Sequence, residues 1–143
     1  MNELWFVFDV NDLLEHGFFK KNICGEPIDN TRYDIGRYKF FLLSLITTWF
    51  EDTFNESLTI SYTGENKFEF NRIDHAQAFL DEYIELEGFK KAVPTHLSML
   101  SKTRIWCNEN LESNDWCMLP VSESEVVFLK NESDAVALKL ALY

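Results

Sequence analysis

The cysteines and histidines of this chain are the side chains best suited to metal binding and to nucleophilic or acid–base chemistry. There are three of each type: Cys24, Cys107, Cys117, His16, His75 and His96. Nine residues separate Cys107 from Cys117, whereas a structural zinc site uses cysteines about two to four residues apart. No two histidines are spaced four residues apart, as a pair on one helical face would be. The sequence therefore predicts no metal site, and no cofactor is expected.

Nucleophilic catalysis requires a cysteine or serine beside a histidine that an acid orients. The chain has these residue types but no local motif such as G-x-S-x-G. We therefore expect no catalytic residues and a protein that is not an enzyme. The alternative is a small enzyme whose site the fold assembles, with Cys107 or Cys117 beside His75 or His96.

Phosphate binding is disfavoured by both the glycines and the charge. The five glycines are scattered, so no glycine-rich loop presents successive backbone N–H groups to a phosphate. Thirteen Lys and Arg residues against 24 Asp and Glu residues give a net charge of −11, which repels nucleic acid. We expect no direct nucleic-acid binding. The charge suits a partner protein with a basic surface, or imitation of nucleic acid itself.

The acidic residues are unevenly distributed along the chain. Residues 73–87 contain five acids and no Lys or Arg, and residues 105–137 contain seven acids and a single base, Lys130. Asp81 and Glu85 are four residues apart, a spacing at which like charges on a helix repel each other. An ordinary solvated helix face is one interpretation. The other is an acidic surface that docks on a basic partner, formed by Asp81, Glu82, Glu85, Glu87, Glu109, Glu112 and Asp115.

Length and composition predict one folded domain over residues 1–143. With 143 residues, of which 46% are hydrophobic, the chain can bury a core without disulfides. An odd, sparse set of cysteines and an N-terminus without a basic segment argue against secretion. The longest nearly apolar run, residues 40–50, is about half of the ~20 residues that a membrane span needs. We expect a cytoplasmic protein that does not enter membranes.

Residues 31–54 carry the strongest helical pattern. Apolar residues recur at helical spacing at Tyr38, Phe41, Leu42, Leu45, Ile46 and Trp49. Phe40, Leu43 and Phe50 lie off this stripe, so more than one face of the helix is apolar. We expect a central helix packed on both sides. A homodimer interface through Phe41, Leu45 and Trp49 would produce the same pattern.

The remaining elements are expected to be short. Apolar or alternating runs predict strands at 4–8, 58–63, 67–70, 116–121 and 125–130. Helices are expected at 12–16, capped by Asp9 or Asn11, and at 74–86 and 132–142. Residues 22–30 form a loop, 64–66 and 122–124 form turns, and 90–114 are taken as a loop with a possible short helix.

Together these elements predict an α+β fold. A strand–turn–strand–helix pattern occurs at 57–86 and again at 116–142, with Asp74 and Asp134 in matching places. We expect an antiparallel sheet of four to five strands with helices packed on one face. The two strand–strand–helix units would be degenerate repeats around the long central helix.

The C-terminal residues 126–143, VVFLKNESDAVALKLALY, resemble the end of many small accessory proteins of T4-like bacteriophages. Those proteins often end in a strand and a helix of the form acidic-Asp-Ala-x-x-Phe-Lys-Leu. Here Asp134, Ala135, Lys139 and Leu140 match that form, with Leu138 in place of Phe. The resemblance covers about 18 residues and carries over no catalytic residue. It implies a phage protein that binds and redirects a host protein, or that blocks a defence nuclease.

Three functions follow from these observations. The first is a non-enzymatic, acidic interaction module, encoded by a phage, which modulates or inhibits a defence or nucleic-acid-handling protein in the host cytoplasm. The second is a structural or assembly protein that forms homo-oligomers through the long helix. The third is the small enzyme with a fold-assembled Cys–His site.

Overall fold

The computed structural model describes residues 6–20, 35–60, 67–121 and 124–143, and the side chains of 35–39 and 60 are not among the described parts. The first half of the chain contains β1 (Phe6–Asp9), α1 (Val10–Glu15), α2 (Ile35–Phe54), β2 (Thr59–Ile60), β3 (Lys67–Phe70) and α3 (Ile73–Tyr83). The second half contains β4 (Lys91–Thr95), the 3-10 helix η1 (Leu97–Met99), α4 (Leu100–Asn110), β5 (Trp116–Val121), β6 (Ser124–Leu129) and α5 (Glu132–Leu142). The predicted α+β class is confirmed.

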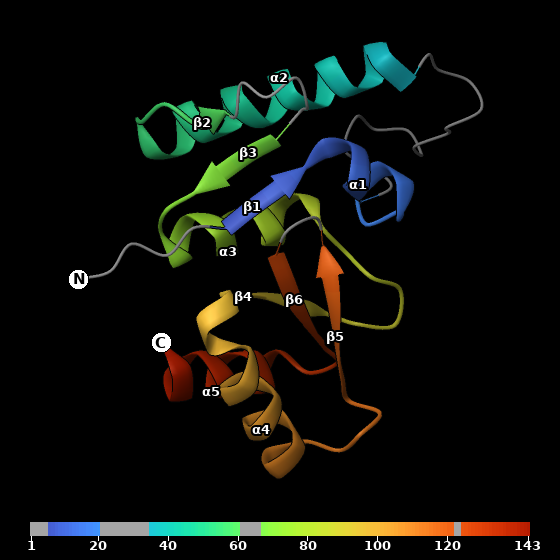
Figure 1. The fold of residues 1–143 in the computed structure, drawn as a ribbon, viewed down its shortest axis with the longest axis vertical. Coiled ribbons are helices and arrows are strands. Elements are labelled where there is room, and N and C mark those ends of the chain that lie inside the picture. The colour runs from blue at the N-terminus through green and yellow to red at the C-terminus, as the bar shows by residue number, and fades with distance from the viewer. Residues whose placement is uncertain (1–5, 21–34, 61–66, 122–123) are drawn as a thin grey trace.

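The described strands form two small antiparallel sheets, one in each half of the chain (Figure 1). The strand order is β1-β3-β2 in the first sheet and β4-β6-β5 in the second. In each half the first and last strands are therefore neighbours in the sheet, and helices connect the first strand to the second. The prediction of one sheet of four to five strands is wrong. In each half a strand and a helical segment also precede the strand–strand–helix unit.

Side chains occupy the strand edges at which the two sheets could have joined. The Ser124 hydroxyl accepts a hydrogen bond from the Val7 N–H at 3.0 Å and donates to the Val7 carbonyl at 3.1 Å. On β4, Gln77 donates to the Ala92 carbonyl at 2.7 Å, and the Tyr143 hydroxyl donates to the Pro94 carbonyl at 3.3 Å. These backbone groups are satisfied without a ladder between the sheets, and this explains the division into two.

Four phenylalanines form one face of the first sheet. Phe6 lies opposite Phe70 and Phe8 opposite Phe68 in the β1–β3 register, and all four side chains are buried. Phe79 of α3 lies 5.1 Å from Phe8, and Phe50 of α2 lies 5.6 Å from Phe70, measured between ring centroids. Both helices therefore cover the same face of the first sheet.

The long helix α2 is peripheral, so the prediction of a central helix is wrong. It crosses the outer side of the molecule, at the top of Figure 1. Leu42, Ile46 and Phe50 are buried, but Phe40 is 71% exposed and Phe41 is 49% exposed. The predicted stripe is buried only in part, since Leu42 and Ile46 are buried but Phe41 is half exposed. Of the residues off the stripe, Phe40 faces outward, whereas Phe50 is buried and Leu43 packs against the core.

The second sheet is buried on both faces. Val127 and Leu129 of β6 pack against Cys107 of α4 and against Ala135 and Leu138 of α5. Their neighbours Val126 and Phe128 point the other way, into the core of the first half. There the rings of Phe18 and Phe128 stack with centroids 5.7 Å apart and an interplanar angle of 18°. The expectation of helices on one face thus holds for the first sheet and not for the second.

Local signals predicted most of the remaining described elements. Asp9 caps α1, with its carboxylate accepting a hydrogen bond from the Asn11 N–H at 2.7 Å, and Gly17 follows with φ of +69°. The prediction of a loop with a possible short helix at 90–114 is right about a helix, α4, and wrong about the loop, because β4, η1 and α4 occupy most of the segment. The predicted loop at 22–30, the turn at 64–66 and part of the turn at 122–124 lie outside the described residues, as do the start of the strand at 4–8 and the second half of the strand at 58–63. No helix within the described residues is long and apolar enough to span a membrane.

Candidate functional site

Three of the acidic residues selected from the sequence border one depression in the second half. Glu109 lies near the C-terminal end of α4, Glu112 in the following turn, and Asp115 directly before β5. Asp134, in the first turn of α5, adds a fourth carboxylate. The depression has a volume of about 490 Å³. Its other lining residues are Asn108, Asn110, Leu111 and Asn131. We call Glu109, Glu112, Asp115 and Asp134 the acidic rim.

Short backbone contacts hold the acidic rim in place. The Asp115 N–H donates to the Glu112 carbonyl at 3.0 Å, forming a tight turn that places these two acids side by side. The Lys130 N–H donates to the Asp115 carbonyl at 3.0 Å, which ties the turn to the end of β6. Asn131 donates to the Asp134 carboxylate at 3.2 Å. Three different elements therefore contribute carboxylates to one site.

The electrostatics of the acidic rim favour a cationic partner. The residues described around the depression include four carboxylates and neither lysine nor arginine. Glu109 also lies near the C-terminal end of α4, where the partial negative charge of the helix dipole makes an acid unfavourable. Like charges at this spacing destabilise the fold slightly, so stability does not account for the placement.

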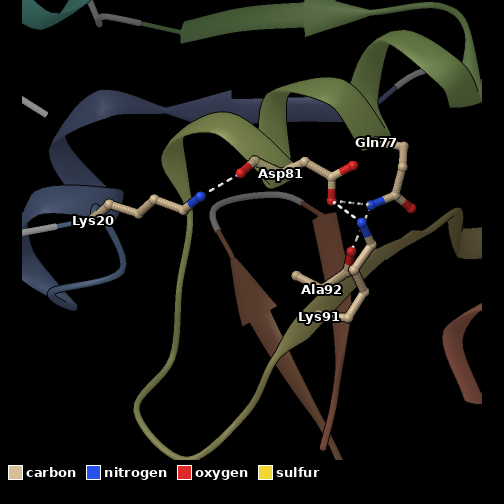
Figure 2. Close-up of polar contacts among 5 residues, drawn as sticks. All are labelled: Lys20, Gln77, Asp81, Lys91 and Ala92. Carbon is tan, nitrogen blue, oxygen red and sulfur yellow. Dashed lines mark hydrogen bonds and ion pairs between the residues drawn. The ribbon is translucent and has the colours of Figure 1, made fainter. Parts of the chain in front are cut away.

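In the first acidic cluster, residues 73–87, two lysines contact Asp81 (Figure 2). The Asp81 carboxylate lies 2.8 Å from the Lys91 ammonium group and accepts a hydrogen bond from Gln77 at 2.9 Å. Lys20 donates to the backbone carbonyl of Asp81. Asp81 and Glu85 line a separate pocket of about 320 Å³ together with Lys20, Lys90 and Lys91. This pocket carries both signs of charge.

Glu82 and Glu87 line neither depression, although both are exposed. The seven selected acids therefore do not form one surface around a single depression. Glu109, Glu112 and Asp115 come together, Asp81 and Glu85 lie among lysines, and the remaining two are separate. Asp134 was not selected from the sequence, although it falls within the same acid-rich stretch as the other three.

The thiols and histidines named for the enzyme alternative differ in burial, since Cys107 and His75 are buried whereas Cys117 and His96 are partly exposed. Cys107 is fully buried among the residues of the second half, and burial with the nearby charge of Asp134 raises its pKa from 9.0 to about 11. Burial also raises the pKa of Cys117. His75 packs against Phe50 and Phe54 beneath α2. A raised pKa disfavours the thiolate, which is the nucleophilic form. Cys24 lies outside the described residues.

His96 is hydrogen bonded to a serine. Its Nδ1 lies 2.7 Å from the Ser98 hydroxyl and accepts the Ser98 N–H at 3.1 Å. Both contacts belong to the N-cap of η1, and no described acid is hydrogen bonded to the imidazole. The arrangement caps a helical turn, and it lacks the orienting carboxylate of a catalytic triad.

Within residues 6–20, 35–60, 67–121 and 124–143, no group of three or more His, Cys, Asp and Glu side chains could hold a metal ion.

The residues named for a homodimer are only partly available. Leu45 and Trp49 pack against the core, where the Trp49 ring lies 5.3 Å from that of Tyr83. Phe41 is exposed, as is its neighbour Phe40. A homodimer interface through α2 would therefore have to use Phe40 and Phe41, near the start of the described side chains of this helix.

Comparison with other proteins leaves the site to be interpreted from its own geometry. The chain matches no protein-family model, no curated protein and no solved structure.

Proposed function

We propose that this chain is a non-enzymatic interaction module that binds a partner protein with a basic surface. The observation that supports it is the acidic rim, where Glu109, Glu112, Asp115 and Asp134 border one depression without a lysine or arginine in its described lining. A basic side chain of a partner would supply the missing positive charge. Complementary charge of this kind increases association rates and selects partners.

The contrast between the two acidic clusters indicates which of them is the binding surface. Around Asp81 and Glu85 the chain provides its own lysines, so a partner would have to displace an ion pair to gain one. A partner that binds the acidic rim has no lysine or arginine to displace from its described lining. We therefore assign the binding surface to the rim and exclude Asp81 from it, while Glu82 and Glu85 serve as references.

The biological setting is part of the proposal. The resemblance of residues 126–143 to the ends of T4-like phage accessory proteins favours a phage-encoded protein that acts on a host target in the cytoplasm. With a net charge of −11, a defence or nucleic-acid-handling protein is a suitable target class, because such proteins carry basic surfaces. The chain would then imitate nucleic acid at that surface.

The test begins with a tagged capture from bacterial lysate at low and high salt, read by mass spectrometry. A partner that binds through charge is captured at low salt and released at high salt. The binding affinity of the purified partner is then compared between two double variants, Glu109→Lys/Glu112→Lys and Glu82→Lys/Glu85→Lys. In both pairs the two glutamates are exposed and stand at positions i and i+3, and the two double variants change the charge equally.

We expect the first double variant to lose affinity for the partner and the second to retain most of it. Equal losses would show that net charge alone matters, and unchanged affinity in the first variant would contradict the proposal. The exposure of Phe40 and Phe41 supports one other candidate function, self-assembly through α2. Light scattering tests that candidate, because a clean ~17 kDa monomer would exclude it.

A further inference from the structure

The outer edge of β5 lies beside the acidic rim and is the feature that carries a further inference. In the second sheet β6 is the middle strand, so β5 and β4 are its two edges. Asp115 belongs to the rim and directly precedes Trp116, the first residue of β5. The strand edge and the charged depression thus meet at one point.

The register shows which backbone groups of β5 point away from the sheet. Lys130 donates to the Asp115 carbonyl, so these two residues form a hydrogen-bonded pair. Such pairs alternate along an antiparallel ladder. Cys117, Leu119 and Val121 therefore bond to β6, whereas Trp116, Met118 and Pro120 direct their backbone groups outward. The position of Pro120 agrees with this assignment, because proline has no N–H to donate to β6.

The outer edges of β1 and β4 are occupied by side chains. Ser124 satisfies the outward N–H and carbonyl of Val7 on β1. Gln77 and Tyr143 satisfy the outward carbonyls of Ala92 and Pro94 on β4. In the described part of the chain, no such bond is made to the backbone of Trp116 or Met118. An edge with free backbone groups is the usual template for strand addition.

We infer that β5 accepts an extended segment of a basic partner as an added strand, with Lys or Arg side chains of that segment entering the acidic rim. This inference rests on the proposed function and specifies the partner's docking element. Trp116 and Met118 supply the outward N–H and carbonyl groups, and Pro120 limits the ladder to the half of β5 that adjoins Asp115. The partner segment is therefore short, and its basic residues lie at the end that passes Trp116.

Charge complementarity selects this occupant over a second copy of the chain. Pairing of two β5 edges would bring together two molecules that each carry a net charge of −11. It would also leave both acidic rims without a cation. A basic segment neutralises the rim and completes the ladder in the same contact.

Selection from a display library of random peptides of about ten residues tests the inference, since that length covers a typical strand. The matched variants are Met118→Pro, which removes an outward N–H without removing a bond to β6, and Met118→Leu, which keeps it. We expect selected peptides to carry Lys or Arg toward one end and strand-forming residues elsewhere. We expect Met118→Pro to weaken their binding by about tenfold or more, and Met118→Leu to leave it nearly unchanged.

Hydrogen exchange on the unmodified chain provides a second measurement that does not depend on the folding of a variant. The Trp116 and Met118 amides should exchange quickly in the free chain and become protected when a selected peptide binds. The Cys117 and Leu119 amides should be protected in both states. The inference is wrong if no peptide is selected, if selected peptides bind Met118→Pro equally well, or if the outward amides stay unprotected.

These results separate the inference from the proposed function. If charge reversal at Glu109 and Glu112 abolishes binding of the captured partner while Met118→Pro does not, the acidic surface stands and strand addition is wrong. If neither change affects binding, both are wrong. A dimer that Met118→Pro disrupts would assign the edge to a second copy and overturn the inference.

Discussion

Ser124 bridges the two halves of the molecule through both backbone groups of Val7. Its hydroxyl oxygen accepts the Val7 N–H at 3.0 Å and donates to the Val7 carbonyl at 3.1 Å, across 117 residues of sequence. Ser124 is the first residue of β6 and Val7 lies within β1, so a single side chain takes the place of a strand ladder there. The contact is buried at Ser124, where water cannot replace a missing bond.

Replacement of this serine should therefore destabilise the fold. Ser124→Ala leaves a backbone donor and an acceptor of Val7 without their partner, at a cost of about 1–3 kcal/mol in the free energy of unfolding. Urea denaturation measures the change. Ser101→Ala, on the exposed surface of α4, is the control and should alter stability by no more than about 0.5 kcal/mol. Equal effects of the two substitutions would show that the bridge contributes nothing specific.

His75 offers the opposite case, a buried polar atom that the fold leaves unsatisfied. Its Nδ1 has no hydrogen-bond partner among the described residues, and its ring lies 4.1 Å from that of Phe54 and 5.2 Å from that of Phe50. His75→Phe should be neutral or should raise the free energy of unfolding by about 1 kcal/mol, because an unpaired polar atom is replaced by an apolar one. Thermal and urea denaturation measure the change.

His96 supplies the control for that prediction. Its Nδ1 accepts the Ser98 N–H at the start of η1, so His96→Phe removes a cap. We expect this change to lower stability by about 1 kcal/mol. A loss of stability in His75→Phe as large as that in His96→Phe would mean that His75 has a partner that the described residues do not reveal.

The sequence predicted the elements better than their arrangement, for reasons that single residues illustrate. Proline is rarely compatible with a strand, yet Pro94 occupies an outward-facing position of β4 where no N–H is required. The division into two sheets depends on Gln77, Ser124 and Tyr143 reaching strand edges far away in sequence. Local patterns contain no information about such contacts.

The candidate site shows the same limit. The clustering of Glu109, Glu112 and Asp115 follows from their closeness in sequence, and the structure brings them together. The surroundings of Asp81 could not be predicted in this way, because Lys20 contacts its backbone from 61 residues away and Lys91 lies on another element. The sequence favoured Asp81, Glu82, Glu85 and Glu87 as the main binding face, with the second cluster contributing. The fold instead places lysines around Asp81 and none in the described lining of the rim.

The thiol of Cys107 should make the free energy of unfolding depend on pH in the alkaline range. Burial and the charge of Asp134 raise the pKa of this thiol from 9.0, its ordinary value in an unfolded chain, to about 11. The folded state therefore favours the protonated thiol. Its contribution to stability is complete below pH 9 and is lost as the pH rises through about 11.

Between pH 9 and 11 the free energy of unfolding should fall more steeply in the unmodified chain than in Cys107→Ala, by up to about 1.4 kcal/mol per pH unit. Denaturation with urea across this range, under reducing conditions, measures both slopes. Parallel slopes would show that the thiol titrates normally. They would also reopen the possibility that Cys107 acts as a nucleophile.

The acidic rim should cost the fold stability, as expected of residues kept for binding. Glu109→Gln removes a like charge from the rim and an unfavourable charge from the C-terminal end of α4, so we expect a gain of about 0.3–1 kcal/mol at low salt. Glu82→Gln is the matched control, because Glu82 lies near the C-terminal end of α3 and outside the rim. The gain from Glu109→Gln should exceed the gain from Glu82→Gln. That excess should shrink as salt is raised, since ions screen repulsion between exposed charges. If the two gains were equal at every salt concentration, the helix dipole alone would explain them, and mutual repulsion within the rim would be disproved.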